Sequence, residues 1–596
     1  AQSGSWLPGT AARLPSRALL LTSVAVLVGG TSFALWRNGW SGPTKTVAAA
    51  PLNIAVLPFA NNGRPEDEYF ADGVADEIRG QLARLPSLQV ISSASAERFR
   101  DSVGLQAVAR QLGAAYLLTG KVRREPAPGR PARVQLSSEL IQVSQVPAPV
   151  TRWQRVYDTV STALPRLQSS IAREVAEVMG LHGKRQEQTA GLEQRRPEAY
   201  EAYLRGQQIL RQGASGPGDL RRAIAEFQAA VNQDSMFAAA WAQLGWAEAA
   251  LWNNASTDEN LLENAKAHGD RALRIGGAEA EARQVLAFYH IMKGNRGAAR
   301  EETRKGLEAD PSNARLVGYS ASLLELEGQW QEALRFRQRA ATLDPTAAGP
   351  AAGLATNLLW LRRYGDARRA ADRYLILGPT NPEAYQLRAM VALGEGKLEE
   401  ARRYIRTGAG QIPSEALLPF VATYWDLYWL LDHDQQAQVL SMGPAQLYSD
   451  TVWWQTASAA IHLDQGDTAA ARRDAGAARD RLSRQLKTTP DDADTHSRLA
   501  LVDAYLGRRD EATHEAERSI SLLPIAKDAL NGALLVYRLA CVQSRLGLHS
   551  EALVTLETLL SVPFYVSPAW LRVDPNFSGL RDNPEFRKLT DMQLSH

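Results

Sequence analysis

Two adjacent stretches of the chain repeat one pattern and decide the fold. Residues 311–344 read PSNARLVGYSASLLELEGQWQEALRFRQRAATLD, and residues 345–378 read PTAAGPAAGLATNLLWLRRYGDARRAADRYLILG. The two stretches are equally long, and each begins with proline. Alanines recur at matching positions of both, among them Ala321 and Ala355 and also Ala333 and Ala367. A period of this kind, about 34 residues, predicts a stack of structural repeats.

The period extends outward from these two stretches. Three series keep the same step: Pro311, Pro345, Pro379 and Pro413; Ala265, Ala299, Ala333, Ala367 and Ala401; and Ala287, Ala321, Ala355 and Ala389. Small residues at fixed positions let two antiparallel helices cross closely, and proline follows the second helix because it cannot continue one. One helix pair cannot bury its apolar face alone, so successive pairs are expected to stack.

The best single unit carries a motif that resembles a known family. Residues 241–245 read W-x-x-L-G, and residues 223–230 of the preceding unit contain A-x3-F-x2-A. These residues resemble the tetratricopeptide repeat, although Ser235 stands where that family has proline. The resemblance implies a mainly helical fold, an α-solenoid of about nine helix pairs over residues 197–563, followed by a C-terminal tail at 564–596. The repeat pattern fades over residues 415–450 and then returns.

The N-terminal region has a different composition. Residues 18–36 read ALLLTSVAVLVGGTSFALW, a run without a charge, with Arg17 before it and Arg37 after it. A helix of that length spans about 28 Å, enough for the core of a bilayer. We therefore expect a transmembrane helix at 18–36, a juxtamembrane segment at 1–17 and a linker at 37–51. A signal peptide cleaved near residues 48–50 and a buried helix of a globular domain are the alternatives.

The pattern changes again from residue 52 and predicts a small α/β domain over residues 52–182. Short apolar or alternating runs at 52–60, 88–92, 116–123, 133–143 and 151–158 are typical of strands. The runs at 67–85, 103–112 and 164–179 have helical spacing.

The segment IAVLPF…EYFADGVADEI at residues 54–78 resembles the extracytoplasmic domain known as TolB-N or FlgO-like. Residues 567–586 are similar to the tail of such chains. The resemblance implies a single-pass protein of the bacterial inner membrane with its C-terminal domains in the periplasm. In this family a Ser/Thr kinase, a CadC-like winged-helix domain or an adenylate cyclase domain usually precedes the membrane helix. Only the short segment 1–17 precedes the uncharged run, so such an effector is expected upstream of residue 1 or is missing.

Composition and motifs give no sign of catalysis. The chain has 67 Lys and Arg against 65 Asp and Glu, which predicts no nucleic-acid partner, and a single cysteine, Cys541. Phosphate-binding, kinase, zinc-protease and nucleophile-elbow motifs are not found, so we expect no catalytic residue and no cofactor.

Two sets of residues could be thought to bind a metal ion. The loop and helix-end residues at 432–434 and 462–464 could ligate a metal, but the sequence shows no third ligand placed beside them. We interpret them as solvated polar residues. An acidic helix face formed by Asp67, Glu68, Asp72, Asp76 and Glu77 favours the helix dipole, with a cation site as the alternative. No metal site is predicted.

The resemblance also places a binding groove on the first helix of each pair. The groove positions carried over from the family are Trp246, Gln284, Phe288, Met292, Ser322, Thr356, Trp360, Gln386 and Met390. Apolar and aromatic residues prevail among them, which favours an apolar concave groove for a protein or peptide segment. The alternative is that these side chains pack on neighbouring repeats or on the 52–182 domain.

We therefore expect a membrane-anchored protein that binds a protein partner as a scaffold or as a sensory input module. The alternatives are the extracytoplasmic half of a receptor kinase, adenylate cyclase or membrane-bound transcriptional regulator, and a structural subunit of a larger membrane complex. The sequence gives no oligomeric state.

Overall fold

The computed structural model describes residues 52–100, 104–127, 130–181, 196–211, 217–255, 258–443 and 451–592. The predicted juxtamembrane segment, transmembrane helix and linker all lie outside the described residues. Within the described residues, every helix is too short or too polar to cross a membrane.

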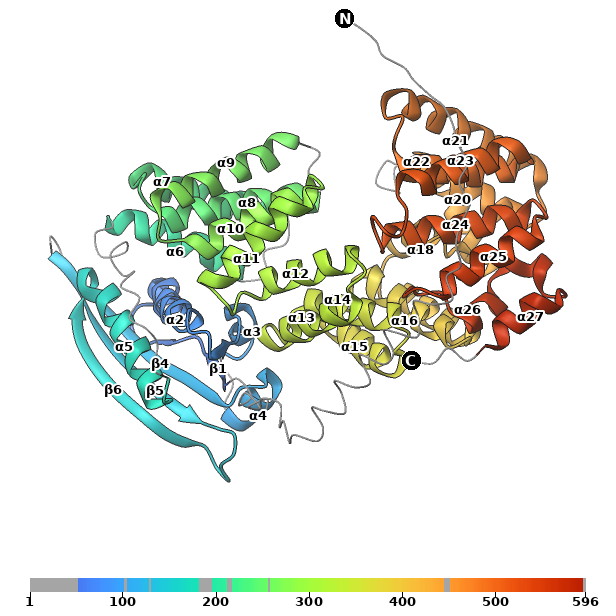
Figure 1. The fold of residues 1–596 in the computed structure, drawn as a ribbon. Coiled ribbons are helices and arrows are strands. Elements are labelled where there is room, and N and C mark those ends of the chain that lie inside the picture. The colour runs from blue at the N-terminus through green and yellow to red at the C-terminus, as the bar shows by residue number, and fades with distance from the viewer. Residues whose placement is uncertain are drawn as a thin grey trace, which may run out of the picture. The chain divides into compact units, whose positions relative to one another are not determined.

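A mixed sheet forms the first part of the described chain (Figure 1). Its strands are β1 (Leu52–Val56), β2 (Ala60–Asn61), β3 (Leu88–Val90), β4 (Tyr116–Ala127), β5 (Arg130–Gln142) and β6 (Val150–Val160). The strand order is β3-β1-β4-β5-β6, and β2 pairs with β4. Strand β1 runs parallel to β3 and β4, whereas β4, β5 and β6 form an antiparallel meander.

Helices cover the sheet where its strands are apolar. Helices α2 (Glu68–Ala83) and α5 (Leu164–Val178) pack on one face, and α3 (Ser93–Glu97) and α4 (Leu105–Leu112) pack on the other. Strand β5 alternates buried and more exposed residues, so only one of its faces is covered. The 3-10 turns η1 (Pro65–Asp67) and η2 (Ser161–Ala163) lead into α2 and α5.

Twenty helices follow as ten consecutive pairs within the described residues, where the sequence pattern predicted about nine. The pairs are α6 (Pro197–Arg211) and α7 (Pro217–Gln233), α8 (Ala238–Ala255) and α9 (Glu259–Ile275), α10 (Glu279–Met292) and α11 (Arg296–Ala309), α12 (Ala314–Leu326) and α13 (Trp330–Leu343), α14 (Ala348–Trp360) and α15 (Tyr364–Leu377), α16 (Pro382–Gly394) and α17 (Leu398–Ala409), α18 (Ser414–Thr423) and α19 (His433–Ser441), α20 (Thr451–Asp464) and α21 (Thr468–Thr488), α22 (Ala493–Tyr505) and α23 (Arg509–Leu522), and α24 (Asn531–Arg545) and α25 (His549–Leu560). The short pair α18–α19, joined through η3 (Tyr428–Leu430), lies in the stretch where the repeat pattern fades.

The periodic small residues lie where the helices of a pair cross. All members of both alanine series are fully buried, including Ala333 in α13 and Ala367 in α15. At Gly245 in α8, an added Cβ would lie only 2.8 Å from the carbonyl oxygen of Ala265 in α9. Two backbones this close leave no room for a larger side chain, which explains the pattern. The chain therefore has a tetratricopeptide-like repeat fold.

The last residues are part of the same core as the later repeats. Helices α26 (Pro568–Val573) and α27 (Pro584–Asp591) and the 3-10 turn η5 (Pro575–Leu580) follow α25. Phe564, Tyr565 and Val566 are fully buried in a cluster that also contains residues of α14 and α16. The segment predicted as a tail is therefore folded against repeats that lie far earlier in the sequence.

Candidate functional site

A cavity of about 640 Å³ lies between helix α2 and the first helix of each of the first four pairs. We call the first helix of every pair an inner helix and this cavity the inner pocket. Its walls come from α2 and the start of α3 on one side and from α6, α8, α10 and the α11–α12 turn on the other. The pocket thus needs both the sheet domain and the repeats.

Close packing of α2 on α6 positions these walls. An added Cβ at Gly73 of α2 would lie only 2.4 Å from a methyl carbon of Leu204 of α6, so glycine allows the two helices to approach. Leu204 is buried in the core of the sheet domain, although it belongs to the first repeat. A core shared in this way fixes α2 against the repeats.

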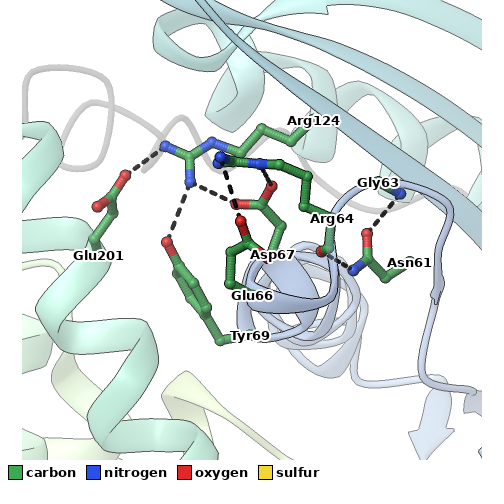
Figure 2. Close-up of polar contacts among 8 residues, drawn as sticks. All are labelled: Asn61, Gly63, Arg64, Glu66, Asp67, Tyr69, Arg124 and Glu201. Atoms are coloured by element: carbon green, nitrogen blue, oxygen red, sulfur yellow. Dashed lines mark hydrogen bonds and ion pairs between the residues drawn. The ribbon is translucent and has the colours of Figure 1, made fainter.

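A cluster of polar residues around Arg124 holds the same junction at its outer side (Figure 2). The Arg124 guanidinium, from β4, donates to Asp67 Oδ1 and to the Tyr69 hydroxyl at 3.1 Å each, and it pairs with Glu201 of α6. Its cationic plane also lies 5.0 Å from the centre of the Phe70 ring. One arginine therefore connects the sheet, the start of α2 and the first repeat helix.

A second junction attaches the edge of the sheet to two repeat turns. Ser95, fully buried in α3, donates to Asp344 Oδ1 at 2.6 Å and accepts from the Thr346 backbone N–H at 3.0 Å. Ser92, the N-cap of α3, also donates to Asp344. The Ser312 hydroxyl, in the α11–α12 turn, bonds to the backbone of the edge strand β3.

Negative charge prevails in the inner pocket. It is lined by seven carboxylates, Asp76, Glu77, Glu279, Glu281, Glu308, Asp310 and Asp344, and by four cationic side chains, Arg79, Arg84, Lys305 and Arg315. Burial raises the pKa of Asp310 to about 6; Arg79 opposes this shift and Glu281 adds to it. Burial also raises the pKa of Glu77, with Glu281 again adding to the shift. Carboxylates in such surroundings are stabilised by an incoming cation.

Aromatic rings form another part of the wall. The Arg315 guanidinium lies 4.5 Å from the centre of the Trp246 ring, and Phe288 contacts the same indole in an edge-on arrangement at 6.0 Å. Tyr200 and Tyr203 of α6 lie opposite α2 and stack on each other at 6.4 Å. One face of the Trp246 ring is thus covered by a guanidinium of the same chain.

The predicted groove residues of the first pairs fall partly in this pocket. Trp246 and Gln284 line it, and Gln284 accepts a hydrogen bond from Asn313 Nδ2 at 3.1 Å. Phe288 is buried behind Trp246, and Met292, the last residue of α10, is 40% exposed and is not among the lining residues. The lining is polar rather than apolar, which corrects the expected character of this half of the groove.

The middle of the predicted groove is polar as well. The Ser322 hydroxyl donates to the Gly318 carbonyl oxygen at 3.2 Å and accepts from Arg337 at 3.0 Å. Arg337 in turn pairs with Glu325, which also accepts from the Asn357 amide. Thr356, which directly precedes Asn357 in α14, is half-buried. Arg337 fills the space in front of Gly353, so a charged side chain lies against this part of α14.

The last part of the predicted groove is closed by the chain itself. Trp360 and Met390 are each only 1% exposed, and Gln386, also 1% exposed, donates to the Tyr424 carbonyl oxygen. Trp360 packs against Trp425, Phe564 and Tyr565. The prediction that these three residues face a partner is corrected, because residues beyond 420 cover them. The alternative, packing within the chain, applies here.

Arg362 binds the C-terminal segment that covers this part of the groove. Its guanidinium donates to the carbonyl oxygens of Leu560, Val562 and Val566 at 3.0–3.3 Å. The residue has a positive φ of 56°, a conformation that side chains other than glycine rarely adopt. The surrounding contacts hold it there, since they leave the guanidinium buried among backbone acceptors.

The N-terminal part of the acidic face of α2 is paired with arginines. Glu68 and Asp72 both bond to Arg100, and Asp67 bonds to Arg64 and Arg124. Within the described residues, no group of three or more His, Cys, Asp or Glu side chains is placed to hold a metal ion. Three of the carboxylates of this face thus already have arginine partners within the chain. At the other candidate, Asp432 caps helix α19 in a capping box with Gln435.

Sequence reasoning missed several residues of the inner pocket. Glu281 lies three residues before the predicted groove residue Gln284, and Arg315 follows Glu281 by 34 residues, the step of the repeat, so the repeat pattern could have identified both. Asp310 and Asp344 each precede a periodic proline, a signal of the turn but not of the pocket. The contribution of Glu77 depends on how α2 docks, which no local pattern encodes.

Comparison with known proteins gives one sequence relative and several structural ones. No family model matches the chain. A protein of Rhizobium meliloti (strain 1021) described as "Putative adenylate cyclase 3" is 29% identical over 260 residues, which are 41% of this chain and 41% of that protein. The match thus spans about two-fifths of the length of this curated relative.

Several solved structures are similar to parts of the chain. Pseudomonas aeruginosa PilF is 22% identical over 37% of this chain and 96% of its own, with a TM-score of 0.28. YrrB, described as a TPR protein with an unusual peptide-binding site, is 18% identical over 33% of this chain and 96% of its own, with a TM-score of 0.22. Cut9–Hcn1 of the APC/C is 16% identical over 72% of this chain and 83% of its own, with a TM-score of 0.31.

Proposed function

We propose that this chain is a non-catalytic protein-binding module whose inner pocket holds a basic segment of a protein partner. The observation that carries the proposal is the excess of carboxylates over cations in the pocket, next to the Trp246 ring. The pocket is large enough for a few side chains of a peptide.

The chemistry of the pocket favours Lys or Arg over other side chains. Glu77 and Asp310 have raised pKa values because burial disfavours their charged forms. An ammonium or guanidinium group placed between them and Glu281 stabilises the charged forms and gains their attraction. Binding should therefore strengthen as the pH rises through about 6, where Asp310 loses its proton.

Selection from a random peptide library tests this proposal. The full chain should enrich sequences with Lys and Arg, and a Glu77→Gln/Glu281→Gln variant should lose that enrichment. A Glu415→Gln variant, changed at an exposed residue of α18, should select the same peptides as the unchanged chain. Enrichment of acidic or apolar peptides, or selection unaffected by the double substitution, would reject a cation-binding pocket.

A second function is favoured by the match to the Rhizobium protein. The chain would then be the sensory input part of a larger nucleotide cyclase, and partner binding at the pocket would be its signal. A receptor Ser/Thr kinase, a membrane-bound transcriptional regulator and a structural subunit of a membrane complex are the other forms of this proposal. The coding region upstream of residue 1 distinguishes the forms that have an effector, since each effector has its own catalytic or DNA-binding motif. Co-purification in mild detergent tests the structural subunit.

The proposal includes a TolB-N/FlgO-like identity for the sheet domain and a single membrane anchor at residues 18–36, with the C-terminal domains in the periplasm of a bacterium. Its support is the sequence of residues 54–78 and the absence of any charge from the 18–36 stretch. Protease treatment of intact spheroplasts should degrade the repeats. Full protection of the repeats until the membrane is permeabilised would place them on the other side.

A further inference from the structure

The outer edge of strand β6 has unused hydrogen-bonding capacity. β6 has 11 residues, ten of which pair with β5, and Arg152 is skipped at a bulge. The strand ends the strand order of the sheet, as Figure 1 shows. Within the described part of the chain, no strand pairs with its other edge. Alternate residues of an edge strand direct their N–H and C=O groups outward, so β6 presents a row of donors and acceptors.

The usual protections of an edge are weak in β6. The strand contains charged residues but no proline, and its bulge at Arg152 lies near its N-terminal end, between the pairs Leu140–Trp153 and Ile141–Thr151. It also exposes apolar side chains: Val156 is 75% exposed, and Val150 and Val160 are exposed as well. A long and partly apolar edge is typical of a strand that pairs with another chain.

The sequence of β6 is complementary to itself when two copies run antiparallel. The strand reads VTRWQRVYDTV over residues 150–160. If Arg155 lies on a two-fold axis, Arg152 faces Asp158 of the other copy and Trp153 faces Tyr157. Thr151 and Val150 lie beyond the bulge at Arg152 and do not continue this pairing. Opposite charges and aromatic pairs are among the cross-strand combinations that stabilise antiparallel sheets.

The charges near the axis are balanced within each copy. Arg155 pairs with Glu174 of α5 at 3.4 Å, so the two arginines that approach each other each bring a carboxylate. Asp158 already pairs with Arg133 of its own chain and can accept from Arg152 as a second partner. The fit is that of a C2 interface, in which each residue contacts its counterpart reciprocally.

We propose that two copies of this chain pair their β6 strands antiparallel about Arg155, which joins their sheets into one continuous sheet. The occupant of this edge is a second copy rather than another protein because the complementarity is between the strand and itself. The inner pocket lies near β3, which is at the other end of the strand order from β6, and it stays accessible in such a dimer.

Cysteine cross-linking tests the register. Directly opposed residues of an antiparallel pair have Cβ atoms about 5 Å apart, within reach of a disulfide. The full-length Arg155→Cys chain in mild detergent should form a covalent dimer on oxidation. A Val554→Cys chain, changed at a valine of α25 that is also exposed, should not, and the native Cys541 is buried. Cross-linking at Val156→Cys in preference to Arg155→Cys would overturn this register.

Sedimentation with charge variants tests the interface itself. Gln154 and Val156 face each other across the axis and are both exposed, so a Gln154→Lys/Val156→Lys chain should sediment as a monomer. A Gln154→Glu/Val156→Glu chain should also be monomeric, and an equimolar mixture of the two should restore the dimer. A wild-type chain that is monomeric at its highest soluble concentration, or a dimer that persists in the lysine variant, would overturn the proposal.

Discussion

The hydroxyl of Ser312 accepts a hydrogen bond from the backbone N–H of Val90 at 3.1 Å, across 222 residues of sequence. The same hydroxyl lies 3.3 Å from the Leu88 carbonyl oxygen, to which it donates. A single side chain from a repeat turn thus completes the edge of β3, which would otherwise leave buried backbone groups without partners.

Replacing Ser312 by Ala should therefore destabilise the chain. The Val90 N–H and the Leu88 carbonyl lose their partner while they stay buried, which costs about 1–3 kcal/mol. Denaturant unfolding should show the loss. Ser235→Ala is the control, since Ser235 is exposed in the turn between α7 and α8, and its effect should be negligible. Equal stability of the two variants would mean that the edge of β3 does not depend on this hydroxyl.

Arg362→Gly isolates the contribution of the buried guanidinium to the C-terminal closure. Glycine adopts the positive φ of this position without strain, so the backbone is not disturbed. Three carbonyl oxygens nevertheless lose a charged donor, and we expect the free energy of unfolding to fall on the order of 3 kcal/mol. Limited proteolysis should then cleave the segment around residues 561–567 first. Unchanged resistance at that segment would contradict the fastening role of Arg362.

Trp246 and Trp360 were both predicted to line one groove, but replacing each by alanine should have different effects on stability and on peptide binding. Trp360 is fully enclosed, and removing its ring leaves a cavity that costs about 3–5 kcal/mol. Trp246 lies half-buried at the wall of the inner pocket, so Trp246→Ala should cost less and should chiefly weaken peptide binding. Thermal unfolding measured alongside peptide titration separates the two effects. Similar losses of stability in both variants would argue against an open pocket at Trp246.

Asp310 should make the chain less stable as the pH rises. Its pKa is about 6 in the folded chain against an ordinary value of 3.8, so the folded state holds the proton more tightly than the unfolded state does. Its contribution to stability is greatest below about pH 4, falls between about pH 4 and 6, and then stays constant.

Asp310→Asn removes this dependence and can retain the acceptor that Oδ1 provides to the Ser312 N–H. We expect the variant to be more stable than the wild type at pH 7 by about 1–3 kcal/mol and to lose part of the decline between about pH 4 and 6. Unfolding curves of both chains across this range provide the measurement. A wild-type stability that rises over the same interval in parallel with the variant would contradict the raised pKa.

The sequence alone determined the local units of this protein. Alanines recur at a constant step because each helix pair crosses at the same place, and Ala333 and Ala367 are fully buried at equivalent positions. Alternation in β5 and the helical spacing of α2 likewise reflect contacts between near neighbours, which a periodic pattern records directly.

Only the tertiary structure decided which faces of those units stay open. Trp246 and Trp360 both sit on inner helices, yet one borders a pocket while the other is covered by residues from far later in the chain, such as Phe564. The acidic pocket needs Glu77 from the sheet domain beside Asp310 from a repeat turn. Contacts between such distant segments depend on docking surfaces that many residues form together. A periodic sequence pattern therefore does not predict them.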